Sequence, residues 1–333
     1  MLGVGATIGT GIFVALTTAV PAAGPAVILS FVLAGITAAL TALCYAELAS
    51  TIPVSGSSYS YAYATLGEFV AFMVGACLLL EYAPSASAIA VGWGQYLNEM
   101  LVDLVGWKMP DAIAKAPGAG GVFNLPAVVL VGACMVLLLR GVKESTSVNA
   151  VLVVLKLLVL LFFVAVAFSG FHAGNLTPFM PMGVAGVGLR PRRSSSRTSA
   201  STRSRRRAGG GQGPAPHPAA GHRAVLLIVT AIYILVALAA VGAQPWTAFA
   251  GQEAGLAVIL RNLTGQAWTS LILCVGAIVS IFSITLVVMY GQTRILYAMS
   301  RDGLLPKLFQ HAWTPRPAAR TSTPTSSRPS SRC

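Results

Sequence analysis

Long apolar stretches alternate with short polar connections along most of the chain. Seven of them are long enough to be membrane spans, at residues 1–23, 25–48, 69–97, 125–139, 148–171, 224–241 and 268–289. A helix needs about 20 apolar residues to cross the hydrocarbon layer, where its backbone must satisfy its own hydrogen bonds. Pro21, Gly24 and Pro25 separate the first stretch from the second, as helix-ending residues do. The pattern predicts an all-α integral membrane protein.

Composition agrees with a chain that uses lipid as its solvent. Hydrophobic residues make up 56% of the sequence and charged residues only 9%, whereas a soluble domain has about 25% charged residues. The cysteines lie at no metal-ligand spacing. The sequence also contains no Ser/His/Asp set, HExxH motif or CxxC motif. We therefore expect no metal, no cofactor and no enzyme activity.

One segment departs from this pattern, because residues 190–223 contain nine arginines and no acidic residue. A run of Arg, Ser, Gly and Pro has no hydrophobic period and does not enter a bilayer. One interpretation is a disordered cytoplasmic loop. Another is a membrane-tethered arm that binds nucleic acid or another anion. The segment has no Phe, Tyr or Trp for base stacking, so we expect no nucleic-acid partner.

A third interpretation is a shift of the reading frame. If suitable codons for residues 195–207 are read one base earlier, they spell FFAYIGFDAVSTA, an apolar and aromatic sequence that fits a membrane helix. A crossing between Val187 and Arg223 is also needed if positively charged loops are to lie on one side. We therefore expect four regions: helices one to five at 1–187, an anomalous segment in place of helix six at 188–222, helices seven and eight at 223–300, and a cytoplasmic stretch with a disordered tail at 301–333.

Glycines cluster inside the first apolar stretch, at Gly3, Gly5, Gly9 and Gly11. Each glycine weakens a helix by about 1 kcal/mol relative to alanine, so the cluster favours local unwinding. Unwound backbone at membrane depth can hold an ionic substrate, because its N–H groups and carbonyls are free. The same glycines could instead serve close helix packing. A dinucleotide-binding loop does not fit, because no strand precedes the cluster.

Two ionisable residues lie inside predicted spans. Lys156 is central in the span 148–171, where a charge costs about 2.5–3.5 kcal/mol, so it is expected to face a cavity. Asn149, seven residues earlier, lies on the same face. Glu81 interrupts the span 69–97 and is the expected acidic partner of Lys156 in a proton relay. A fixed buried salt bridge is the alternative role for Glu81.

Several motifs in order resemble the amino acid–polyamine–cation permeases, and the cationic amino-acid transporter branch in particular. They are the GATIGTGIF sequence ending at Phe13, the IPVSGSSYSY sequence ending at Tyr61, and the segments around Glu81, Lys156 and Arg294. The resemblance implies a fold of five-plus-five inverted repeats with a broken first helix, of which this chain is a fragment.

The resemblance also implies a function and a site. Amino acids would be imported across a bacterial plasma membrane by proton symport, with the substrate held by the backbone of Ile8, Gly9, Thr10 and Gly11. Lys156 would occupy the place of a coupling sodium ion and carry the proton, with Glu81 as its partner. The partners are then the amino acid, protons and the lipid bilayer. Without an intact sixth helix and with helices absent after Leu308, we expect the chain as printed to be incomplete or inactive.

Overall fold

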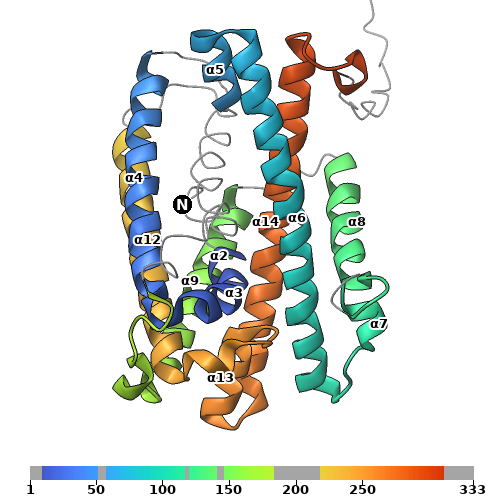
Figure 1. Cartoon of the computed structure of the whole chain (residues 1–333). Helices are drawn as coiled ribbons and strands as arrows, with labels where there is room; N and C mark the ends of the chain where they lie inside the picture. Colours follow the sequence, from blue (N-terminus) through green and yellow to red (C-terminus); the bar gives the residue numbers. More distant parts are fainter. Residues whose placement is uncertain (1–9, 52–57, 117–119, 141–145, 184–217, 311–333) are drawn as a thin grey trace, which may run out of the picture.

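The structure is a computed structural model that describes residues 10–51, 58–116, 120–140, 146–183 and 218–310. These residues form helices and connecting turns (Figure 1). The α-helices are α2 (Thr10–Phe13), α3 (Ala15–Ala23), α4 (Val27–Thr51), α5 (Ser58–Leu66), α6 (Glu68–Val105), α7 (Asp111–Ala114), α8 (Leu125–Leu139), α9 (Thr146–Ser169), α12 (Pro218–Ala243), α13 (Gly255–Thr264) and α14 (Ala267–Arg301).

The long helices run side by side between two ends of a bundle (Figure 1). Helix α14 packs against α6, α8 and α9, and α12 packs against α4 and α9. Helix α5 lies at one end, whereas α7 and α13 lie at the other. The short helices α2 and α3 lie within the bundle, where α2 contacts α14. Helix α9 therefore connects the two groups of helices around them.

The surface of the bundle is apolar. Five stretches are long and apolar enough to cross a membrane: Gly11–Tyr45, Glu68–Val105, Ala150–Ser169, Leu226–Ala243 and Ala267–Arg301. The first contains both α3 and α4, which meet at Gly24 with a φ of 64°. Large side chains such as Phe69 and Leu227 are 77% and 70% exposed. Because water would disfavour so much exposed apolar surface, the chain is a multi-pass membrane protein.

The predicted spans correspond closely to the observed helices. The six stretches from 25–48 onward are α4, α6, α8, α9, α12 and α14, and the stretch 1–23 is described only from Thr10. Helix α6 continues to Val105, eight residues beyond the predicted end of its span. Glu99 and Asp103, which follow the predicted end of the span, are therefore helical. The predicted segment 188–222 and the tail from 311 lie largely or wholly outside the described residues.

The directions of α9 and α12 bear on the segment between them. The backbone N–H of His172 and the side-chain amide of Asn175, both just after α9, donate to the carbonyl of Gly242 near the end of α12, at 3.0 and 2.9 Å. The two helices therefore run in the same direction. Pro181 still lies at that end, against Gly24, whereas Pro218 begins α12 at the opposite end. The sequence between Gly183 and Pro218 has to connect the two ends.

Close packing of α9 on α14 depends on a glycine. A Cβ atom at Gly276 would lie 2.5 and 2.8 Å from the two methyl carbons of Val159. Small residues at such contacts let membrane helices approach each other closely.

We expect Gly276→Leu to separate α9 from α14 and to destabilise the protein by about 1–3 kcal/mol, the usual cost of overpacking. Gly132→Leu is the matched control, because a Cβ at Gly132 of α8 meets no atom within 4 Å. Thermal unfolding in detergent, followed by size-exclusion chromatography, should show a lower transition temperature for the first variant only. Equal stability of the two variants would contradict this packing role.

Candidate functional site

The first helix is interrupted inside the bundle. Helix α2 ends at Phe13 and α3 begins at Ala15, with Val14 between them at φ −107° and ψ −43°. The phenol of Tyr96 on α6 donates to the carbonyl of Phe13 at 2.8 Å, and the hydroxyl of Thr17 donates to the carbonyl of Val14 at 2.7 Å. Side chains thus satisfy carbonyls at the interruption, as buried backbone groups require.

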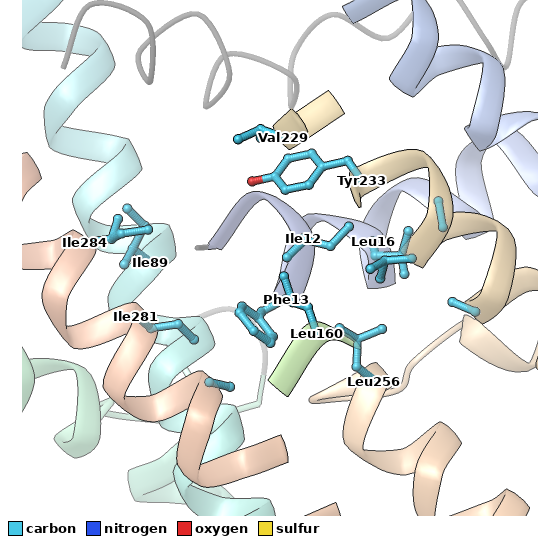
Figure 2. Packing of buried hydrophobic residues seen from close by; sticks show 14 of the residues in the cluster. Ile12, Phe13, Leu16, Ile89, Leu160, Val229, Tyr233, Leu256, Ile281 and Ile284 are labelled. Atoms are coloured by element: carbon cyan, nitrogen blue, oxygen red, sulfur yellow. The ribbon is translucent and has the colours of Figure 1, made fainter. Parts of the chain in front are cut away.

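Neighbouring helices approach this interruption closely. The side chain of Val14 lies against Gly92 of α6, where a Cβ atom would clash with it. On the other side, a Cβ at Gly11 would lie 3.1 Å from the hydroxyl oxygen of Tyr233 on α12. Figure 2 shows the ring of Tyr233 reaching toward α2. The backbone of α2 is therefore enclosed between α6 and α12.

The predicted break is described only in part. The glycine cluster predicted a break near Ile8 to Gly11; of these residues, Thr10 and Gly11 lie in the helical turn of α2, and the described part of the chain has an interruption at Val14. Ile8 and Gly9 lie outside the described residues. Val14 packs on Gly92, a contact between residues far apart in the sequence. Substrate binding by residues 8–11 stays a prediction.

Lys156 lies in the interior of the bundle. Only 1% of its surface is exposed, on the buried stripe of α9 that also contains Val153, Leu160 and Phe163. Figure 2 shows Leu160 beside Phe13. Lys156 lies one turn before Leu160 on the same face, so its side chain belongs to the interior near α2. A cavity-facing role fits a lysine that would otherwise face lipid at high cost.

Buried hydroxyls on α14 lie at the level of Lys156. Val159 contacts Gly276, and α9 and α14 run in opposite directions (Figure 1). One turn toward the start of α9 therefore corresponds to one turn toward the end of α14, where Ser280 is 0% exposed; Ser283, one further turn along, is 4% exposed. The region around the lysine is polar within an otherwise apolar core.

Glu81 lies on α6, a different helix that packs on α14. Its neighbour Tyr82 is 1% exposed and lies against Gly291 of α14, where a Cβ would be 3.1 Å from the tyrosine ring. Glu81 and Lys156 thus belong to two helices that both contact α14. The exchange of a proton between them stays a prediction.

An ionic cluster lies at the α13 end of the bundle. Nη1 of Arg261 on α13 lies 2.6 Å from Oε1 of Glu99 and 3.2 Å from Oδ1 of Asp103, both on α6. The Arg261 cluster consists of these three residues. Glu99 and Asp103 are one helical turn apart, so their charges would repel each other without the guanidinium between them. The cluster lies in the part of α6 that extends beyond the predicted end of its span.

A different polar contact lies at the opposite end of the bundle, between α5 and the residue that follows α14. The phenol of Tyr59 on α5 donates to Oδ2 of Asp302, just after α14, at 3.0 Å. Burial and the hydrogen bond to Asp302 raise the pKa of Tyr59 far above its ordinary value. The phenol therefore stays protonated and can donate at any physiological pH. This contact joins α5 to the α6 and α14 pair.

Tyr96, Tyr233 and Arg261 were not predicted from the sequence as parts of a site. The tyrosines resemble ordinary residues of apolar helices, and nothing local shows that their rings reach α2. A signal for the Arg261 cluster was present, because Glu99 and Asp103 have the spacing of one helical turn. Their common partner is Arg261, which lies 158 residues after Asp103 in the chain. No pattern in the sequence indicates this pairing.

These features define a class of protein. An interrupted helix inside an apolar bundle is the arrangement that secondary transporters use to hold ionic substrates at membrane depth.

The comparisons with known proteins identify the family. The amino acid permease family model matches residues 1–189 and 220–323, and the chain belongs to this family. It is 42% identical over 310 residues to the branched-chain amino acid permease BcaP of Bacillus subtilis, covering 92% of this chain and 66% of that protein. It is 41% identical to the methylthioribose transporter of the same organism, over 93% and 67% of the two chains.

A plant relative is more distant. The vacuolar cationic amino acid transporter 2 of Arabidopsis thaliana is 33% identical over 92% of this chain and 49% of that protein. The chain thus spans about two thirds of its Bacillus relatives and half of this plant relative. These relatives are transporters and not enzymes, which agrees with the expectation from the sequence, and the predicted resemblance is confirmed. The family match leaves out residues 190–219, which contain the arginine run.

Proposed function

We propose that the protein imports amino acids across the plasma membrane of a bacterium. The observation that carries this proposal is the interruption at Val14, enclosed by α6 and α12 in a chain of the amino acid permease family. Backbone N–H groups around Ile8, Gly9, Thr10 and Gly11 are suited to the α-carboxylate of the substrate. Carbonyls near the break are suited to its α-ammonium. The names of two relatives, one for branched-chain and one for cationic amino acids, define the first substrates to test.

Protons are the proposed coupling ion. Lys156 is buried on the face of α9 that also contains Leu160, and Leu160 belongs to the same buried cluster as Ile12 and Phe13 of α2. A lysine there supplies a positive charge that can be removed and restored by proton transfer. Glu81 on α6 is its proposed acidic partner.

The orientation follows from the charges at the two ends. The α5 end carries Arg294, Arg301 and Lys307 after the middle of α14, whereas the α13 end carries acidic residues on α6 and before α13. Cytoplasmic ends of membrane proteins are enriched in Lys and Arg. The α5 end is therefore assigned to the cytoplasm and the α13 end to the outside.

The arginine run is unlike the rest of the protein. A membrane-tethered arm for nucleic acid or another anion is the alternative function, but the family match on both sides of the run favours a permease whose sixth helix has been replaced. The parallel directions of α9 and α12 support this view, because they require the intervening sequence to pass between the two ends.

The function can be tested in a completed permease. The completed permease is a chimera of two proteins. Residues 190–222 of the chain are replaced by the aligned stretch of the Bacillus branched-chain permease, and the C-terminal third of that relative is added after Leu308. Uptake into proteoliposomes would be measured for radiolabelled leucine, lysine and methylthioribose.

We expect Gly11→Ala to reduce uptake at least about tenfold, because its Cβ would lie 3.1 Å from the Tyr233 hydroxyl and push that side chain away from the site. Gly132→Ala, whose Cβ meets open space, is the control and should transport normally. If the completed permease without a substitution takes up none of these three solutes, the proposed function is wrong. Normal uptake by the Gly11 variant would contradict the proposed site.

A further inference from the structure

The Arg261 cluster contains more negative than positive charge. Two carboxylates, those of Glu99 and Asp103, share one guanidinium, so the three side chains sum to one negative charge when all are ionised. The side chains of Asp103 and Glu99 are only 2% and 14% exposed. An uncompensated charge with so little access to water is costly, and a carboxylate relieves that cost by taking up a proton. The cluster therefore has the charge balance of a site for one proton.

The charges around the cluster do not supply the missing cation. In the part of the chain that the structure describes, the charged groups that act on Glu99 are Arg261, Asp103 and Glu253, and the last of these is acidic. Glu253 lies 3.9 Å from Nζ of Lys115, which lies closer, at 3.1 Å, to another carboxylate. Lys115 is thus already shared between two acidic groups. The excess negative charge stays with the cluster.

Buried oxygens on the inner side of the cluster can form a further hydrogen bond. Oδ2 of Asp103 and Oγ of Ser270 on α14 are both buried, and neither has a hydrogen-bond partner among the described residues. Cys274, one turn further along α14, has its thiol near the Ser270 hydroxyl and within electrostatic range of Asp103 and Glu99. Buried polar atoms are normally paired. A proton on Asp103 supplies the donor that joins the two oxygens, directly or through a water molecule.

One face of α6 leads from the cluster to the interrupted helix. Tyr96 lies three residues before Glu99 and seven before Asp103, so the three side chains share a face. The phenol of Tyr96 donates to the carbonyl of Phe13 at 2.8 Å and lies within electrostatic range of the thiol of Cys274. Polar groups therefore extend from the cluster to the interruption through an otherwise apolar core.

We propose that the Arg261 cluster binds one exchangeable proton, shared by Glu99 and Asp103, at the outer end of a route to the interruption. The side chain of Arg261 is 36% exposed, so water reaches the cluster from outside. The proton passes from water to a carboxylate oxygen, and no other reactant takes part. Ser270 is a positioning residue, because it holds the protonated carboxyl group. The inference rests on the proposed function only in what the proton is used for, and its binding can be measured without transport.

Infrared difference spectroscopy detects the proton directly, because a neutral carboxyl group has a C=O stretching band that a carboxylate lacks. The purified chain is titrated with acid in mild detergent. Asp103→Asn and Glu99→Gln each leave one carboxylate beside the guanidinium, so both should lower the pH at which the band of this site appears by at least about one unit. Asp111→Asn is the matched control, because that carboxylate is 51% exposed at the same end of the bundle. It should leave the band unchanged.

Removal of the cation should have the opposite sign. In Arg261→Gln the two carboxylates face each other without a guanidinium, so the band should appear at a pH about 1–3 units higher than in the parent. Ser270→Ala should leave this pH nearly unchanged but shift the frequency of the band, because the carboxyl group loses a hydrogen-bond partner. An unshifted band in the Ser270 variant would overturn the role of that hydroxyl.

The signs of these shifts decide the proposal. If Arg261→Gln does not fold, the two carboxylate variants still test it, because Asn and Gln have nearly the shapes of Asp and Glu. A titration that neither carboxylate variant changes, or a shift of the same sign after removal of an acid and of the cation, would overturn the proton site. None of these outcomes depends on uptake. A completed permease that does not transport but keeps this titration would refute the proposed function and leave the proton site standing.

Discussion

Replacing Lys156 with alanine should abolish proton-driven accumulation of substrate by the completed permease. With one proton carried for each substrate molecule, a gradient of one pH unit can support about tenfold accumulation, and the variant should reach a ratio of about one. The reason is that Lys156 is a buried cation on the face of α9 that also contains Leu160. Its removal also eliminates a charge that costs about 2.5–3.5 kcal/mol in the membrane, so insertion should not suffer.

The measurement compares two modes of transport. Accumulation is measured under an imposed pH gradient, and exchange of labelled for unlabelled substrate is measured without one. If the variant no longer accumulates substrate but still exchanges labelled for unlabelled substrate, then substrate binding survives while proton coupling is lost. Lys307→Ala is the control, because that lysine is exposed after α14. Unchanged accumulation in the Lys156 variant would contradict its role in coupling.

The chain as printed should show no saturable amino-acid uptake above empty liposomes. Helices α9 and α12 run in the same direction, so the sequence between Gly183 and Pro218 must connect the two ends of the bundle. That sequence contains eight arginines. At about 2.5–3.5 kcal/mol for each, placing them in the bilayer would cost more than about 20 kcal/mol, which packing contacts do not offset.

The test places two proteins side by side. The chain as printed and the completed permease are reconstituted at the same density, and uptake of radiolabelled amino acids is measured under an imposed pH gradient. Uptake by the completed permease alone would support loss of the sixth helix. Saturable uptake by the chain as printed would show that the arginine run is a working loop of a smaller carrier. The coding DNA across codons 185–225 would reveal a shifted frame directly.

Much of the architecture could be predicted because membrane helices are specified locally. Lipid excludes unsatisfied backbone, so each long apolar stretch had to become a helix, and six of them did so, although α6 and α14 continue 8 and 12 residues beyond the predicted ends. Lys156 could be identified by the same reasoning, because a charge in an apolar helix must face the interior. Its burial agrees with that expectation.

The site was harder to predict because its parts come from distant positions. The glycine cluster indicated an interruption in the first helix, and the described part of the chain has one at Val14, which packs on Gly92. Helix α13 was missed, because ten residues are too few to resemble a span.

By itself, the sequence determined that the protein is an all-α membrane protein, which apolar stretches become helices, and that a lysine lies in one of them. Apolar length and charge decide these properties, and both can be read residue by residue. Only the tertiary structure decided that Tyr96 bonds the carbonyl of Phe13 and that Arg261 joins α13 to α6. Those contacts depend on how helices far apart in the chain pack together, and packing follows from the shapes of both surfaces, which no local pattern contains.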